Sequence, residues 1–142
     1  QLAYTFLDAR FDQAYTSGSG ATAAIVAAGN ALPGAPRHSL FGQAQVKGPA
    51  WLGGMTLAAE TRIESRAYVD DVNSDAAAGY AVLNLSAGKT WQAGGTQWHA
   101  FGRIDNVLDR QYAGSVIVND SNRRFFEPAP GRRVFVGLRA SL

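Results

Sequence analysis

The sequence predicts an all-β fold, an antiparallel up-and-down meander of about six strands, and three observations lead to this expectation. Apolar and polar residues alternate with a period of two in six segments, whereas a helix would need a period of 3.6. Within each segment, most charged side chains occupy alternate positions, which places them on one face of a strand. The segments are joined by connections of alternating length, as in a series of hairpins.

The first three segments lie near 7–12, 40–47 and 55–68, and the third has the clearest pattern. Its apolar or small residues are Met55, Leu57, Ala59, Thr61, Ile63 and Ala67. The residues of the other parity include Thr56, Glu60, Arg62, Glu64, Arg66 and Tyr68. A helix would distribute these charges around its circumference, whereas a strand collects them on one face. We therefore expect a strand whose polar face carries paired ions.

The last three segments lie near 80–87, 98–105 and 133–142. The final one alternates up to the last residue, with Val134, Val136, Leu138, Ala140 and Leu142 on its apolar side. Each segment is long enough for a strand, and none has the continuous ~20-residue apolar run of a membrane helix. A barrel strand does not need such a run, because half of its residues face polar surroundings.

The connections differ in length in a regular order. Long ones span about 16–37 and 109–131, a medium one spans about 70–78, and short ones lie at 48–50 and 92–95. Short turns at one end of the strands and long loops at the other are typical of a transmembrane barrel.

All three tryptophans, Trp51, Trp91 and Trp98, flank the short turns. Amphipathic rings collect where hydrocarbon meets lipid headgroups, so this placement indicates an interfacial girdle. A tryptophan beside a hairpin turn can also simply cover the end of a strand, and both explanations place the strand boundaries in the same positions.

Composition limits the function classes. With 142 residues there is room for one domain, and with no cysteine there is no disulfide or thiol chemistry. The net charge of +2 is too small and too scattered for a nucleic-acid surface. His38 and His99 are isolated from each other, and neither G-x-S-x-G nor H-E-x-x-H occurs, so we expect no metal site, no cofactor and no enzyme. An acidic loop with Asp70, Asp71 and Asp75 lacks the pattern of a calcium loop.

Two arrangements fit one apolar and one charged face. In a soluble β-sandwich or a lipocalin-like binding module, the apolar face packs inside and the charges face water. In an outer-membrane barrel, the apolar face meets lipid and the charges line the interior. The many Ala and Gly residues on the apolar side, the bulky ions on the other and the tryptophans at the short turns favour the membrane arrangement.

Several phrases occur in an order that resembles the TonB-dependent outer-membrane receptors of the siderophore type. They are an aromatic-rich strand from Tyr4 to Phe11, a loop-to-strand junction from Leu32 to His38, Asn106-Val107-Leu108-Asp109-Arg110-Gln111-Tyr112, and Phe126-Glu127-Pro128-Ala129-Pro130-Gly131-Arg132. The motif residues of the last two phrases are Asn106, Asp109, Tyr112, Glu127, Pro128, Pro130, Gly131 and Arg132. From their chemistry we expect structural roles: prolines hold the segment extended, and Asn106 and Asp109 bond their own backbone.

The resemblance implies that residues 1–142 form the C-terminal portion of a barrel of twenty-two strands, without the plug domain. It implies a location in the outer membrane of a Gram-negative bacterium and TonB-energised uptake of a ferric siderophore or similar chelate. The implied partners are that chelate, TonB through the missing plug, outer-membrane lipid and the barrel assembly machinery. Because the chain starts at Gln1 and not at Met, we expect it to be a piece of a longer protein.

The last strand would then carry the assembly signal, with Leu138, Ala140 and Leu142 as its alternating residues. The family usually ends in an aromatic residue, and this chain departs from that pattern with Leu142. Ligand contacts are expected from aromatic and arginine side chains near the long loops, since Arg binds carboxylate or catecholate oxygens and Tyr stacks on flat chelators. The candidate residues are Arg66, Tyr68, Tyr80, Tyr112, Arg123 and Arg124.

Overall fold

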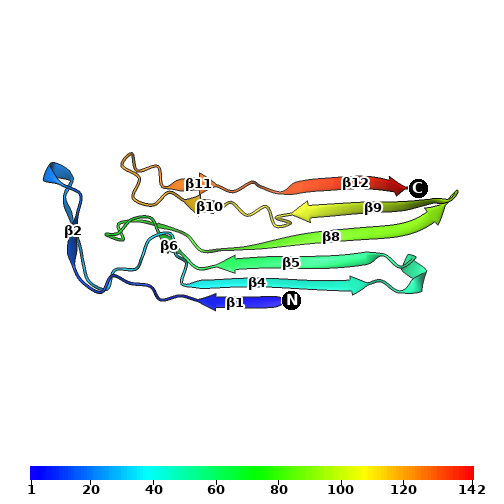
Figure 1. Cartoon of the computed structure of the whole chain (residues 1–142), viewed down its shortest axis with the longest axis horizontal. Coiled ribbons are helices and arrows are strands. Elements are labelled where there is room, and N and C mark those ends of the chain that lie inside the picture. The colour runs from blue at the N-terminus through cyan, green and yellow to red at the C-terminus, as the bar shows by residue number, and fades with distance from the viewer.

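The computed structural model describes residues 1–142, apart from the side chains at positions 22 and 50, and confirms the all-β fold. Its main sheet contains β1 (Leu2–Phe6), β4 (His38–Lys47), β5 (Thr56–Glu64), β8 (Tyr80–Ala93), β9 (Thr96–Asp105) and β12 (Arg133–Ser141). These six strands are antiparallel and pair in the order β1-β4-β5-β8-β9-β12 (Figure 1). Each strand therefore pairs with the next long strand along the chain, which is the expected meander.

The long connections and the short turns lie at opposite ends of this sheet (Figure 1). The long connections form small sheets of their own: β2 (Tyr15–Ser17) with β3 (Ala24–Val26), β6 (Ala67–Tyr68) with β7 (Ala76–Ala77), and β10 (Ala113–Val116) with β11 (Phe126–Pro128). Two single helical turns occur, η1 (Gly20–Thr22) and η2 (Ala50–Leu52). Among the described residues there is no helix with the length and apolar character needed to cross a membrane.

The first strand lies earlier in the chain than the alternation predicts. β1 covers Leu2–Phe6, and the segment 7–12 follows it as an irregular extension. The partner explains the difference, because β4 begins at His38 opposite Phe6 and is preceded by Pro33 and Pro36, which have no N–H to donate. Residues 7–11 are held instead by separate bonds, such as Leu7 N–H to Arg37 O (2.9 Å).

The third predicted strand is shorter than expected at its C-terminal end. β5 stops at Glu64, which lies opposite Ser39 near the start of β4, and the alternation of 65–68 continues only into the small strand β6. Arg66 is therefore not part of the row of ions on β5. Its guanidinium lies over the ring of Tyr68, 5.2 Å from the centroid.

The two faces of the main sheet have opposite character. The register places Leu57, Leu85, Ile104 and Val134 on one face, with Val46 at its short-turn end. Every second residue along each strand lies on the same face. No element of the described chain covers this face: Leu57 is 38% and Val136 is 82% exposed. The apolar residues that would form the core of a soluble sandwich thus lie on the outside of a single layer.

The buried core of the described chain lies mostly among the long loops. Val26 and Val69 are fully buried, and Ala77 and Phe125 are nearly so. Asn73 ties two loops together, because its side-chain Oδ1 accepts a hydrogen bond from Ala31 N–H and its Nδ2 donates one to Ala31 O, both at 2.8 Å. The loops therefore form a small packed cap at one end of the sheet.

Candidate functional site

The polar face of the main sheet holds a row of ions that we call the ion-pair wall: Glu60, Arg62, Glu64, Arg103, Asp105 and Arg133. Pairing of the strands brings these residues together. Glu60 lies opposite Asn84 across β5 and β8, and Asp105 lies opposite Arg133 across β9 and β12. Because side chains alternate along a strand, all of them project from the face opposite Leu57 and Leu85.

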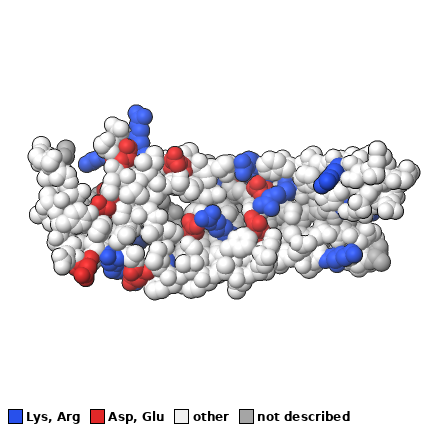
Figure 2. All heavy atoms as spheres, viewed as in Figure 1, with Lys and Arg blue, Asp and Glu red and all other residues white. Residues whose placement is uncertain are grey.

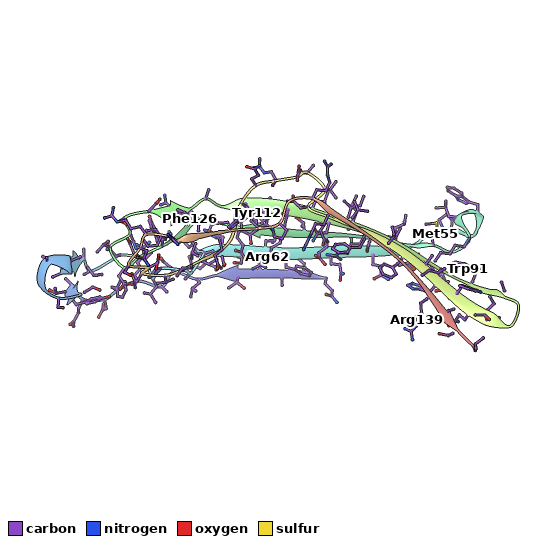
Figure 3. All side chains as sticks on the ribbon, turned by 90° about the horizontal axis from the view of Figure 1, so that it is seen from above. Met55, Arg62, Trp91, Tyr112, Phe126 and Arg139 are labelled. Atoms are coloured by element: carbon purple, nitrogen blue, oxygen red, sulfur yellow. The ribbon has the colours of Figure 1, made fainter. Side chains whose placement is uncertain are left out.

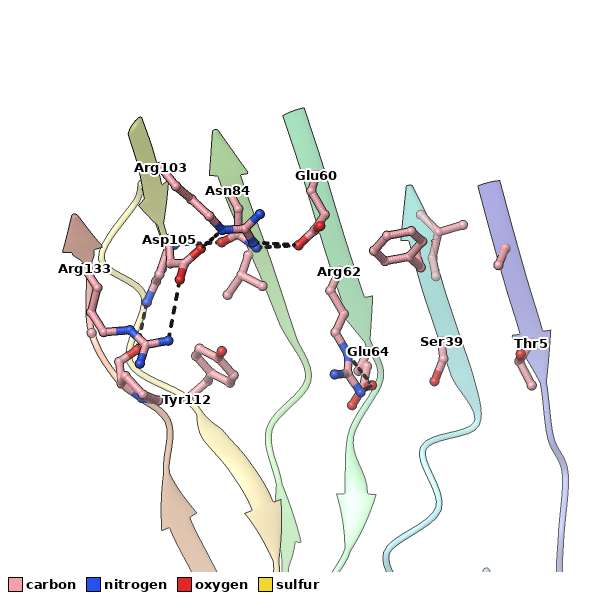
Figure 4. A pocket seen from close by; sticks show the side chains of 17 residues that line it. Thr5, Ser39, Glu60, Arg62, Glu64, Asn84, Arg103, Asp105, Tyr112 and Arg133 are labelled. Atoms are coloured by element: carbon pink, nitrogen blue, oxygen red, sulfur yellow. Dashed lines mark hydrogen bonds and ion pairs between the residues drawn. The ribbon is translucent and has the colours of Figure 1, made fainter. Parts of the chain in front are cut away.

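Arg103 is at the centre of the ion-pair wall (Figure 4). Its Nε donates to Asp105 Oδ1 at 2.6 Å, and its Nη2 donates to Glu60 Oε1 at 3.2 Å. Arg133 Nη2 lies 3.6 Å from Asp105 Oδ2, and Asn84 Nδ2 donates to Glu60 Oε1 at 2.8 Å. These links join four adjacent strands of the sheet.

Arg62 and Glu64 form a separate ion pair on β5, beside the cluster around Arg103 (Figure 4). The wall as a whole carries three carboxylates and three guanidinium groups, so its formal charges cancel. A balanced, hydrogen-bonded ionic surface of this kind is favourable in contact with water, whereas its contact with hydrocarbon costs free energy. The wall is therefore suited to contact with water, and it carries no excess of charge that would concentrate one kind of ion.

Two hollows meet at the Arg62–Glu64 pair. One, of about 580 Å³, lies over the ion-pair wall and is also lined by Tyr112 and Phe41. The other, of about 640 Å³, lies between the loops and is lined mostly by small residues such as Gly34. Both include Arg62 and Glu64 in their walls, so these two side chains lie at the boundary between the loop region and the sheet.

Asn106, the first residue of one family-like phrase, is buried to 4% exposure and fully bonded. Its Oδ1 accepts the Arg110 N–H at 2.9 Å, and its Nδ2 donates to Arg110 O at 2.9 Å and to Pro130 O at 3.4 Å. Its own N–H donates to Asn84 Oδ1 at 2.9 Å. Asn106 thus bonds the local backbone at the exit of β9, and it also contacts the second phrase, 126–132.

The side chain of Asp109 accepts a hydrogen bond from the second phrase, residues 126–132, and not from its own neighbouring backbone as expected. Its Oδ1 accepts the Arg132 N–H at 2.8 Å. A Cβ on Gly131 would lie 3.1 Å from the same oxygen, so glycine leaves room for this contact. Asn106 and Asp109 both have positive φ, 51° in each case, a conformation that Asn and Asp adopt more readily than most residues. We call the hydrogen bonds of the Asn106 and Asp109 side chains, to the Arg110 backbone and to 130–132, the β9–β12 clasp.

The predicted ligand residues fall into three separate places. Tyr80 and Tyr112 lie together, with ring centroids 4.1 Å apart, and border different hollows. Arg66 and Tyr68 pair with each other in another loop hollow, of about 320 Å³. Arg123 and Arg124 belong to an exposed turn around Asp120, whose carboxylate accepts the Arg124 N–H at 2.8 Å. Of the six predicted ligand residues, Tyr80 and Tyr112 are therefore the two that lie together next to the ion-pair wall.

A second ionic cluster forms part of the lining of the loop hollow at Arg66. Asp8 Oδ1 accepts from Arg10 Nε at 2.8 Å, and Asp8 Oδ2 accepts from Arg37 Nη2 at 2.5 Å. Desolvation raises the pKa of Asp8, but the hydrogen bonds and charges of the two arginines outweigh it and hold that pKa below its ordinary value. This cluster connects the segment after β1 to the junction before β4.

The described side chains contain no group of three His, Asp or Glu residues placed to hold a metal ion. The acidic loop uses its carboxylates for local structure, since Asp70 accepts from the Ser74 N–H at 2.7 Å and Asp71 accepts from the Tyr15 hydroxyl at 2.9 Å. Among protein families, no family model matches the chain.

Two features of this region were not evident from the sequence. Arg103, Asp105 and Arg133 lie in the segments predicted as strands, but only the register of β8, β9 and β12 shows that they join Glu60 in one network. The signal available in the sequence was that each of them, like Glu60, lies in the polar phase of its own strand. The contact between 106–110 and 130–132 had no such signal, because the two phrases are more than twenty residues apart.

Proposed function

We propose that this chain is the C-terminal, barrel-forming segment of a TonB-dependent outer-membrane receptor. Such a receptor takes up a ferric siderophore or a similar chelate and performs no chemistry on it. In this proposal the six-stranded meander is one part of a barrel of twenty-two strands, and other strands pair with the outer edges of β1 and β12. The chain contributes part of the wall, three long loops and the last strand.

One observation carries the proposal: an uncovered apolar face spans all six strands, opposite a face of balanced ions. A soluble sandwich would need a second layer on the apolar face, and no element of the described chain provides one. A large exposed apolar surface is unfavourable in water and is the normal outer surface of a transmembrane barrel. The order of the family-like phrases and the position of the short turns support the same assignment.

Within this proposal each part of the chain has a physical role. The ion-pair wall lines the water-filled interior, and the packed loops face the outside of the cell. The Tyr80–Tyr112 pair and the hollow at Arg62 lie where the loop region meets the interior, so a chelate that enters would pass them. The β9–β12 clasp fixes the path of the chain into the last strand, where Leu138, Ala140 and Leu142 would be read by the assembly machinery.

A pair of arginine substitutions on opposite faces tests the proposal. Leu85→Arg places a charge on the apolar face near its middle, where a lipid-facing arginine costs about 2–4 kcal/mol. Ala58→Arg adds the same charge to the polar face of the neighbouring strand β5, opposite Ser86. We expect Leu85→Arg to reduce the fraction of the chain that inserts into lipid vesicles by about thirtyfold or more, whereas Ala58→Arg leaves it nearly unchanged.

The measurement is co-flotation of the refolded chain with vesicles, together with protease protection. A chain that stays monomeric and soluble without detergent and does not float with vesicles would contradict the proposal. Equal effects of the two arginines would contradict the assignment of the faces.

A further inference from the structure

Both lysines of the chain lie at the short-turn end of the main sheet. Lys47 is the last residue of β4, and Lys89 lies in the last third of β8. The segments 44–59, 86–102 and 134–142, which make up this end, contain these two lysines and Arg139 but no Asp or Glu. On the face drawn in Figure 2, acidic and basic side chains are mixed over the loops and the middle of the sheet, and only basic ones appear toward the short turns.

The two lysines belong to opposite faces. Lys47 follows Gln45 in the polar phase of β4, whereas Lys89 lies opposite Ala100 and continues the apolar phase of Leu85 and Ala87. A lysine on a lipid-facing surface is costly at mid-membrane and is tolerated near the headgroups. Its position in the apolar phase therefore places Lys89 at headgroup depth.

Lys89 is half-buried, and its ammonium group is unpaired. It forms no ion pair and no hydrogen bond with the described residues. Its Nζ lies beside the turn between β4 and β5, where a Cβ on Gly53 would approach it to 2.5 Å. The side chain thus bends along the apolar face toward the turn, and its three N–H donors remain available to a ligand.

All three tryptophans lie at the same end of the sheet as Lys89. Trp91 is the next residue of β8 in the apolar phase after Lys89, and it lies opposite Trp98 of β9 with the rings stacked and their centroids 6.5 Å apart. Trp51, on the adjacent turn η2, is 81% exposed. Figure 3 shows Trp91 at the strongly bent short-turn end of the sheet. Indole rings favour the depth at which hydrocarbon meets headgroups, so the tryptophans indicate the same membrane depth for this end of the sheet as Lys89 does.

A groove in the apolar face includes Ala87, the residue before Lys89 in the apolar phase of β8. It has a volume of about 630 Å³ and is lined by Leu57, Ala59, Ala87, Gly102 and Val136 among others. The groove is open because its middle positions are small: a Cβ on Gly102 would meet only Phe135 O, at 3.9 Å. Ala87 is two residues from Lys89 on β8, or about 7 Å along the strand.

We propose that Lys89, the tryptophan pair and this groove form a binding site for one anionic glycerophospholipid. An acyl chain lies in the groove over Gly102, and the headgroup phosphate accepts hydrogen bonds from Lys89 Nζ. Charge complementarity selects this occupant, because the end of the sheet that holds the site carries cations without any acidic side chain. The proposal rests on the membrane location proposed above and adds a preferred lipid in the leaflet at the short turns.

The test uses the whole chain, reconstituted in phosphatidylcholine vesicles with and without phosphatidylglycerol. A fluorescent phosphatidylglycerol reports binding through energy transfer from the tryptophans, and unlabelled phosphatidylglycerol, phosphatidylcholine and inorganic phosphate compete with it. A surface lysine contributes about fivefold to the binding of an anionic lipid. We therefore expect Lys89→Gln to weaken the preference for phosphatidylglycerol by about fivefold or more, and Lys89→Arg to retain it.

Lys47→Gln is the matched control, because it removes the same charge at the same end of the sheet from the opposite face. We expect it to change the preference by less than about twofold, since its ammonium faces away from lipid. Gly102→Val, whose Cβ would contact only Phe135 O, narrows the groove and should weaken binding of the fluorescent phosphatidylglycerol while the chain stays inserted.

Each outcome decides between the two proposals. Equal losses with Lys47→Gln and Lys89→Gln would show non-specific attraction and overturn the site, as would full competition by inorganic phosphate or no effect of Gly102→Val. A chain that inserts equally well in both vesicles and shows no lipid preference would overturn only the site. A chain that inserts in neither would overturn the proposed function itself.

Discussion

Replacing Asn106 by alanine should destabilise the chain strongly, because this residue holds the β9–β12 clasp. The substitution removes two hydrogen bonds of 2.9 Å between the Asn106 side chain and the Arg110 backbone, at a site that is 4% exposed. Loss of each such bond costs about 1 kcal/mol. Alanine at φ = 51° adds about 1 kcal/mol of backbone strain. The expected loss in the free energy of unfolding is therefore about 3 kcal/mol.

Urea unfolding of the refolded chain in detergent micelles, followed by circular dichroism, measures this loss. Asn106→Gly is the informative companion, because glycine removes the same bonds without the strain and should lose about 1 kcal/mol less than alanine. Asn119→Ala is the matched control, since Asn119 also has positive φ (56°) but is exposed and bonds only within the loops. A loss below about 1 kcal/mol for Asn106→Ala would refute the clasp as a structural element.

Two further predictions concern other parts of the chain. Because the folded pKa of Asp8 is lowered, its ion pairs with Arg10 and Arg37 stabilise the loops fully above its ordinary value of 3.8, and this contribution is lost as the pH falls through the folded pKa. Asp8→Asn should remove that acid-dependent part of the unfolding curve, and an unchanged pH profile would contradict the assignment. Gly137→Ala should cost about 1–2 kcal/mol, because its Cβ would lie 2.3 Å from the ring of Phe101 across the ladder. In urea unfolding, the double variant Phe101→Ala, Gly137→Ala should show no added loss from the alanine at 137, and equal losses in both backgrounds would contradict the clash.

The main sheet could be predicted because the sequence pattern that specifies each of its strands lies within that strand and the adjoining turn. The alternation at Leu57, Glu60 and Ile63 reports the two faces of a strand directly, and the short turn at 94–95 fixes the register of β8 and β9. The hairpin turn uses Gly94 and Gly95 at positive φ, the conformation that a two-residue turn requires.

The ends of the strands were less predictable, because a strand ends where its partner does. The alternation around Leu7 and Phe11 continues beyond the ladder, but the opposite chain has prolines there and cannot pair regularly. The expected place of Arg66 on the third strand was wrong for the same reason, since the pairing of β5 with β4 stops at Glu64, two residues earlier.

The loops could not be predicted, because they are held by contacts between distant segments. Asn73 bonds Ala31 across more than forty residues, and Asn119 accepts from the Asp71 N–H at 3.1 Å. Neither asparagine belongs to a motif, and each is recognisable only as a residue that tolerates positive φ. The candidate ligand residues depended on these loops, which is why they lie in separate places.

The orientation of the apolar face can be measured directly, because the chain has no cysteine of its own. Single cysteines introduced along β5 at Leu57, Ala58, Ala59, Glu60 and Ile63 would carry an environment-sensitive fluorophore in lipid vesicles. We expect labels at 57, 59 and 63 to be quenched by brominated acyl chains, and labels at 58 and 60 to be quenched only by an aqueous quencher. The reverse alternation, or equal quenching at all five positions, would contradict a lipid-facing apolar face.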